Sequence, residues 1–200
     1  MTLVDAPVSA PEARVADAAL RCIARWGVAK TTLDDVAREA GCSRATVYRL
    51  FPGGKDNLIE AAVRLETGRF LQGLAAELGD ADELEEVLVR GISYGSRSLR
   101  DCAALQFVLA YEPEVILPRI AFKRLDAVFD AIGVAAAPYL TRFVGEENAG
   151  RVAEWVARLV ISFTLTPSDQ FDLADEASVR RLVRGFVLPG LPVTTLTKGE

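Results

Sequence analysis

The segment from Leu33 to Phe51, LDDVAREAGCSRATVYRLF, constrains the fold of this chain more than any other part of the sequence. Its first half carries apolar residues at positions i, i+3, i+4 and i+7, namely Leu33, Val36, Ala37 and Ala40. This spacing predicts a short helix with one buried face. Gly41 then allows the left-handed backbone on which helices end, and Ser43 is a residue type that caps a following helix. We therefore predict two short helices joined by a tight turn.

The sizes of three residues in this segment predict how the two helices meet. Ala37 is small at the expected crossing, Gly41 lies at the turn, and Val47 supplies an apolar wedge between the helices. These offsets are typical of a helix-turn-helix. The second helix then presents side chains of the types that contact bases and phosphates in a major groove, Arg44, Thr46, Tyr48 and Arg49. The alternative interpretation is an ordinary helical hairpin with solvated arginines.

The longer segment TTLDDVAREAGCSRATVYRLFPGGKDNL resembles the DNA-binding segment of the TetR family of transcriptional regulators. The matching residues are Thr31-Thr32, Ala37, Gly41, Ser43, Tyr48, Phe51 and Lys55. The resemblance covers about the first third of the chain and has two departures. Leu50 stands where the family often has a histidine, so one customary phosphate contact is absent. The family's Phe-x-x-Lys is one residue longer here, with glycines at positions 53 and 54.

The residue types and the resemblance together predict a role for each side chain of this segment. We expect Arg44, Thr46 and Arg49 to contact base edges. We expect the phosphates to be positioned by Thr32, Ser43, Tyr48 and Lys55. The predicted partner is double-stranded DNA with a near-palindromic operator, because a homodimer would place two such helices in successive major grooves.

The charge distribution is compatible with DNA binding even though the net charge is −5. Residues 1–60 hold eight Lys/Arg and eight Asp/Glu, so the remaining fifteen basic and twenty acidic residues carry the whole excess. An acidic body limits non-specific binding to nucleic acid, while local arginines can still bind DNA. The neutral head leaves a second hypothesis open, in which the chain is a helical protein-interaction adaptor that uses the helix-turn-helix as a scaffold. A steep fall of DNA affinity with salt would separate the two.

The sequence contains no arrangement that indicates catalysis or metal binding. It has no histidine, which excludes Ser-His-Asp and Cys-His sites and His-ligated metals. Phosphate-binding and dinucleotide-binding glycine motifs are also absent. The three cysteines are widely spaced and form no CxxC pair, so we expect reduced core residues. We predict a cytoplasmic protein that is not an enzyme, with no cofactor, no metal and no membrane partner.

The rest of the chain predicts an all-α fold of about nine helices, with a three-helix head on a larger helical body. The expected helices span residues 11–26, 33–40, 44–51, 55–78, 81–99, 102–110, 113–143, 146–165 and 175–188. Pro118 and Pro138 are expected to bend or interrupt the seventh helix. We place the DNA-binding domain at residues 1–54 and a ligand-binding and dimerisation domain at 55–200.

Two surfaces of the body follow from the resemblance. In the family the last two helices form a four-helix dimer interface, which here implies Trp155, Val156, Leu159, Phe163, Val179, Leu182 and Phe186. The same apolar stripes could instead pack onto the core. The resemblance also implies a pocket for a small, mostly apolar ligand among the middle helices, lined by Phe107, Tyr111 and Phe122 with Arg97 or Gln106 as the polar group. For any single one of these residues, a place in the core is the alternative. The predicted function is a homodimeric repressor that such a ligand releases from DNA.

Overall fold

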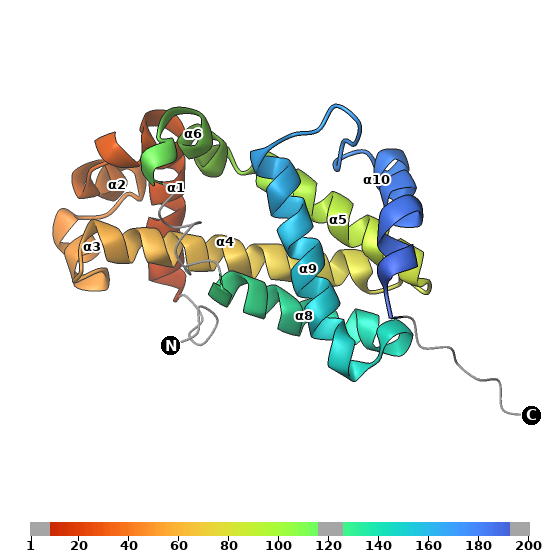
Figure 1. The fold of residues 1–200 in the computed structure, drawn as a ribbon. Helices are drawn as coiled ribbons and strands as arrows, with labels where there is room; N and C mark the ends of the chain where they lie inside the picture. The colour runs from red at the N-terminus through yellow and green to blue at the C-terminus, as the bar shows by residue number, and fades with distance from the viewer. Residues whose placement is uncertain (1–8, 116–125, 193–200) are drawn as a thin grey trace, which may run out of the picture. The chain divides into compact units, whose positions relative to one another are not determined.

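The computed structural model describes residues 9–115 and 126–192, and within these ranges all regular structure is helical (Figure 1). The all-α prediction with an N-terminal helix-turn-helix is therefore confirmed. The helices are α1 (Ala10–Lys30), α2 (Leu33–Glu39), α3 (Arg44–Leu50), α4 (Lys55–Leu78), α5 (Leu84–Asp101), α6 (Ala103–Tyr111), α8 (Asp126–Val144), α9 (Glu146–Leu165) and α10 (Glu176–Leu182). A π-helical turn, η1 (Val183–Val187), and a 3-10 turn, η2 (Leu188–Gly190), follow.

The chain divides into two compact units, and the first comprises residues 1–69 and 101–125. It contains α1, α2, α3, the first part of α4, and α6. Its core is built from the apolar faces that the sequence periodicity predicts, with Val15, Val36, Val47 and Leu58 fully buried. A smaller cluster of Ile23, Ala104 and Val108 joins α1 to α6. The domain boundary at residues 54 and 55 stays a prediction.

The second unit comprises residues 70–100 and 126–200. Its core collects apolar side chains from the end of α4 and from α5, α8, α9 and α10. Small residues allow the α8 and α9 backbones to approach closely, because a Cβ on Gly133 would lie 3.5 Å from the Gly150 carbonyl oxygen. Ala149, Ala153 and Ala157 are buried on α9. These small residues of α9 therefore face the core of their own unit.

Among the described residues, one helix meets the length and hydropathy expected of a membrane span. An 18-residue window of α8 has a mean hydropathy of 1.3, and a third of that window is buried. Core helices meet the same test, and α8 contributes Phe129, Ala136 and Leu140 to buried positions.

The structure corrects several expected helix ends. The helix expected to start at residue 81 begins at Leu84, and α8 continues through Pro138 without interruption. The expected helix over 113–143 includes residues 116–125, with Pro118, which lie outside the described ranges. The α-helical part of the last helix ends at Leu182, and the amide of Leu188 then bonds to the Val183 carbonyl in a π turn. Pro189 has no N–H with which to continue an α-helical ladder.

A network of ion pairs joins α10 and η1 to the start of α5. Arg180 donates to Glu85 at 2.7 Å and to Glu86 at 3.2 Å, and Arg184 donates to Glu85 at 2.8 Å. The hydrogen bonds from Arg184 and Arg180 lower the pKa of Glu85 below its ordinary value of 4.5. Glu85, which the sequence alone places near a helix start, thus connects residues almost one hundred positions apart.

We expect the Glu85 network to make the stability of the fold pH-dependent. Because the folded-state pKa is lowered, ionised Glu85 stabilises the fold above pH 4.5, and this contribution disappears as the pH falls through the lowered pKa. Glu85→Gln should therefore lower the free energy of urea unfolding at neutral pH, and its deficit should shrink below pH 4.5. Glu83→Gln, an exposed residue without an ion pair in the described chain, is the control. An equal deficit at both pH values would contradict this account.

Candidate nucleic-acid interface

The helix-turn-helix is held together by buried apolar contact and a tight turn. Val36 and Ala37 of α2 and Val47 of α3 are buried, so the predicted wedge lies in the core. Gly41 adopts φ +64°, the left-handed conformation predicted for it. Its neighbour Cys42 donates its amide to the Ala37 carbonyl at 3.0 Å. The turn therefore fixes the direction in which α3 leaves α2.

Hydroxyl side chains cap both helices of the motif. The Asp35 amide donates to the Thr32 Oγ1 at 3.2 Å, and the Asp35 carboxylate accepts from the Thr32 amide and hydroxyl. The Thr32 hydroxyl hydrogen bond lowers the pKa of Asp35. Ser43 accepts the Thr46 amide at 3.1 Å, and the two hydroxyls lie 2.9 Å apart. The cap predicted at Ser43 is confirmed.

The exposed face of α3 carries the side chains predicted to contact DNA. Arg44, Tyr48 and Arg49 are exposed, and Thr46 is half-buried. Arg44 is bound to Asp34 of α2, with its Nε 2.9 Å from Oδ1 and its Nη1 donating to Oδ2 at 3.0 Å. Its Nη2 donates to the Tyr48 hydroxyl at 3.3 Å. The Tyr48 hydroxyl and the Asp34 charge raise the pKa of Arg44.

The loop before α4 accommodates its additional residue through glycine. Phe51 is buried and anchors the loop, and the amide of Gly54 donates to the Phe51 carbonyl at 2.8 Å. Gly54 adopts φ +70°. Lys55 is the first residue of α4, and its Nζ donates to the Ala29 carbonyl at 3.3 Å. Lys55 is thus held beside the segment that enters α2.

The entry to α2 is fixed by a carboxylate that sequence reasoning missed. Gly27 breaks the helical backbone of α1 at φ +82°. The amides of Val28 and Ala29 then donate to the buried Glu112 carboxylate at 2.6 and 3.1 Å. Glycine is required at position 27 because the backbone there has a positive φ, and because a Cβ would lie 2.4 Å from a Glu112 oxygen. No local sequence pattern could pair Glu112 with residues more than eighty positions away.

The structure brings together only part of the predicted ligand pocket. The Phe107 and Tyr111 rings of α6 lie 4.9 Å apart between centroids with their planes tilted by 47°, and Tyr111 is exposed. Gln106 lies on the same helix, half-buried. Arg97 belongs to the second unit and lies 3.9 Å from Glu77 and 3.7 Å from Glu176. Phe122 lies outside the described residues, so the pocket stays a prediction.

The predicted dimer residues fall into three groups. Trp155 and Phe186 are 46% and 70% exposed. Val179 and Leu182 are buried in their own unit and offer no surface to a partner. The stripes pack partly onto the core, since Val156, Leu159 and Phe163 are half-buried against it.

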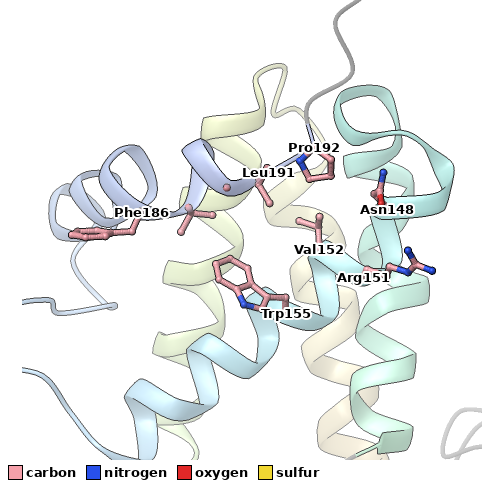
Figure 2. Close-up of a pocket in the computed structure, with 9 residues that line it drawn as sticks. Asn148, Arg151, Val152, Trp155, Phe186, Leu191 and Pro192 are labelled. Carbon is pink, nitrogen blue, oxygen red and sulfur yellow. The ribbon is translucent and has the colours of Figure 1, made fainter.

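A groove of about 340 Å³ lies between α9 and the residues that follow α10 (Figure 2). Its lining comprises Asn148, Arg151, Val152, Trp155, Phe186, Val187, Gly190, Leu191 and Pro192. Figure 2 shows the Trp155 indole in the middle of this surface. The exposed aromatic residues therefore border a shared, mostly apolar hollow.

Comparison with known proteins points to one family. Residues 15–62 match the model of the family described as bacterial regulatory proteins, tetR family. An uncharacterized HTH-type transcriptional regulator of Mycobacterium tuberculosis (strain H37Rv) is 30% identical over 178 residues, covering 88% of this chain and 83% of the relative.

Solved structures with lower identity share the fold. The TetR family repressor AlkX from a Dietzia strain superposes with a TM-score of 0.67 at 21% identity, over 92% of this chain and 98% of that one. The fatty acid degradation regulator FadR from Bacillus halodurans superposes with a TM-score of 0.63 at 16% identity, over 91% of this chain and 98% of that one.

The Glu112 contact yields a direct prediction. Glu112→Ala would leave the partly buried amides of Val28 and Ala29 without their acceptor, which should cost about 1 kcal/mol of unfolding free energy. We expect that loss in urea unfolding, together with faster hydrogen exchange at these two amides. Glu114→Ala, an exposed neighbour, should change neither quantity. Unchanged exchange at Val28 in the Glu112 variant would show that the carboxylate does not hold the kink.

Proposed function

We propose that this chain, which belongs to the TetR family of bacterial transcriptional regulators, is a homodimeric repressor that a small, mostly apolar ligand releases from a near-palindromic operator. Members of this family are regulators and not enzymes, in agreement with the expectation from the sequence. In this proposal residues 1–54 bind DNA, residues 55–200 bind the ligand and the second copy, and the protein acts in the cytoplasm.

The observation that carries the proposal is the exposed face of α3. Val47 holds the helix by its buried side, and Ser43 caps it, so the side chains opposite are presented on a rigid base. We assign base edges to Arg44, Thr46 and Arg49, and phosphates to Thr32, Ser43, Tyr48 and Lys55. Repression is favoured over activation because occupancy of a promoter is sufficient to block it.

The exposed aromatic groove supports the proposed dimer. Trp155 and Phe186 are both exposed, and both line the same groove. Exposed apolar patches of this kind mark interaction sites. A two-fold pairing of these surfaces would give two copies of α3. Their spacing should match one helical turn of DNA, about 34–36 Å, or a multiple of it.

The contact between α6 and α1 supports a route for ligand release. Glu112 ends α6 and binds the amides that precede α2. A ligand that favours another position of α6 would therefore alter the entry to the helix-turn-helix. Because such a ligand binds the conformer with displaced α6 more tightly than the DNA-binding conformer, it lowers the affinity for DNA. AlkX is implicated in biodegradation of n-alkanes and FadR in fatty acid degradation, so alkyl and acyl chains are the first ligands to test.

The test of DNA binding is fluorescence anisotropy with the duplex immediately upstream of the chain's own gene and with a random duplex, over a series of salt concentrations. Tight, salt-sensitive binding that prefers the upstream duplex supports an autoregulating repressor. Equal weak binding to both duplexes places the operator elsewhere. Failure to bind either duplex at low salt favours the adaptor hypothesis instead.

Two substitutions should separate base contacts from phosphate contacts. Arg44→Ala should cost ~1–3 kcal/mol on the preferred duplex and relax base preference, because Arg44 is assigned a base edge. Lys55→Ala should weaken binding to all duplexes alike and reduce the salt slope by about 1. If Arg44→Ala leaves both affinity and preference unchanged, the assignment of α3 as recognition helix is wrong.

The dimer proposal predicts a change of mass in solution. Light scattering at micromolar concentration should give twice the chain mass for the wild type. Trp155→Lys should give a monomer, because it places a charge in the proposed interface, and Val134→Lys should stay dimeric although Val134 is also exposed, on α8. A monomeric wild type, or a dimeric Trp155 variant, would count against this interface.

A further inference from the structure

We propose that Asp34 is a positioning residue that gives Arg44 its selectivity for bases over phosphates. The inference rests on the proposed function, because it assigns a role within the same DNA-binding surface. Asp34 has no part in the capping of α2, which Thr32 and Asp35 perform between them. Its partner is Arg44, ten residues away on the next helix.

The geometry of the pair leaves a defined part of the guanidinium available. Asp34 accepts a hydrogen bond from Nη1 at 3.0 Å, its other oxygen lies 2.9 Å from Nε, and the Tyr48 hydroxyl accepts from Nη2. An arginine side chain has five N–H groups, and these two hydrogen bonds use one on each terminal nitrogen. One N–H remains on each terminal nitrogen. Two donors are what a bidentate contact with the O6 and N7 of guanine requires.

The Asp34 carboxylate also cancels the charge of Arg44 where DNA would lie. Non-specific affinity comes from cations that neutralise phosphates, so a paired arginine adds little to it. Both side chains are largely open to solvent, with 63% of Arg44 and 49% of Asp34 exposed. Exposed ion pairs are weak, so the pair can adjust when a base edge approaches.

Arg49 provides the contrast on the same helix. It is exposed and has no ion pair within residues 9–115 and 126–192. Arg38 of α2, by comparison, lies 3.3 Å from Asp35. An unpaired Arg49 can attract any phosphate, whereas Arg44 is held by a carboxylate and a hydroxyl. Beside its assigned base edge, Arg49 therefore also adds general attraction to DNA, which the pairing with Asp34 removes from Arg44.

The test uses the full-length protein and a duplex library with a randomised central segment. The sequence that the wild type enriches is compared with a random duplex, by anisotropy over a series of salt concentrations. Asp34→Asn should raise affinity for the random duplex roughly two- to fivefold, the range for opening an exposed ion pair. Its salt slope should steepen by about 0.9, as for one more neutralised phosphate. The ratio of the affinity for the enriched duplex to the affinity for the random duplex should fall. The sequences that the variant enriches should show a weaker base preference at one position.

Two controls separate positioning from charge. Glu60→Gln makes the same change of charge at an exposed α4 residue without an ion pair in the described chain, and it should leave the affinity ratio unchanged. In an Arg44→Ala background, Asp34→Asn should no longer alter the ratio. Asp34→Ser should reproduce the loss of selectivity, which guards against a folding defect peculiar to the asparagine variant.

The outcomes distinguish this inference from the proposed function. If the wild type enriches no sequence, the proposed function itself fails. If the wild type selects a sequence and Asp34→Asn leaves the ratio unchanged, only the role of Asp34 is overturned. The same holds if the variant lowers the ratio equally without Arg44, because Asp34 would then act through its charge alone.

Discussion

The apolar contact between α2 and α3 is the interaction on which the DNA-binding surface depends. Val36 and Val47 are fully shielded from solvent, and Ala37 allows the helices to come together. Close-packed interiors resist even small changes of volume, so this contact fixes α3 in one orientation. Seven residues are too few for a stable isolated helix, and α3 exists because tertiary packing and the Ser43 cap hold it.

The orientation of this small core relative to the rest of its unit depends on a second constraint, at the kink of α1. Gly27 ends the regular helix, and Glu112 accepts the amides that the kink leaves free. A buried carboxylate is stable there because the two amides satisfy both of its oxygens. The residue that ends α6 thus contacts the segment entering α2, which makes the head responsive to the position of α6.

Many of the exposed arginines in the described part of the chain are paired with carboxylates. Around the motif, Arg44 is bound to Asp34 and Arg38 to Asp35, which explains how a neutral head can still expose arginines. In the second unit, Glu85 gathers Arg180 and Arg184 and fixes the C-terminal helix to α5. Pairing of this kind limits non-specific attraction to nucleic acid, and it leaves discrimination to the geometry of a few side chains.

What the sequence determined by itself was local. Apolar spacing, Gly41 and the cap at Ser43 predicted the helix-turn-helix, because each acts within one or two helical turns. The bounds of α9 were also predictable, since its apolar stripe runs unbroken between Gly145 and Thr166. Where proline stands inside α8 or follows η1, the local signal did not predict whether the helix would continue.

Only the tertiary structure decided which distant residues meet. Asp34 and Arg44, Glu112 and Gly27, and Glu85 and Arg184 are paired by the packing of separate helices, and no periodicity encodes such pairs. Packing likewise assigned Val179 and Leu182 to the core while it left Trp155 and Phe186 exposed, although all four belong to the same predicted stripes. A helical period tells which side chains share a face, but the neighbour that covers this face is chosen by the fold as a whole.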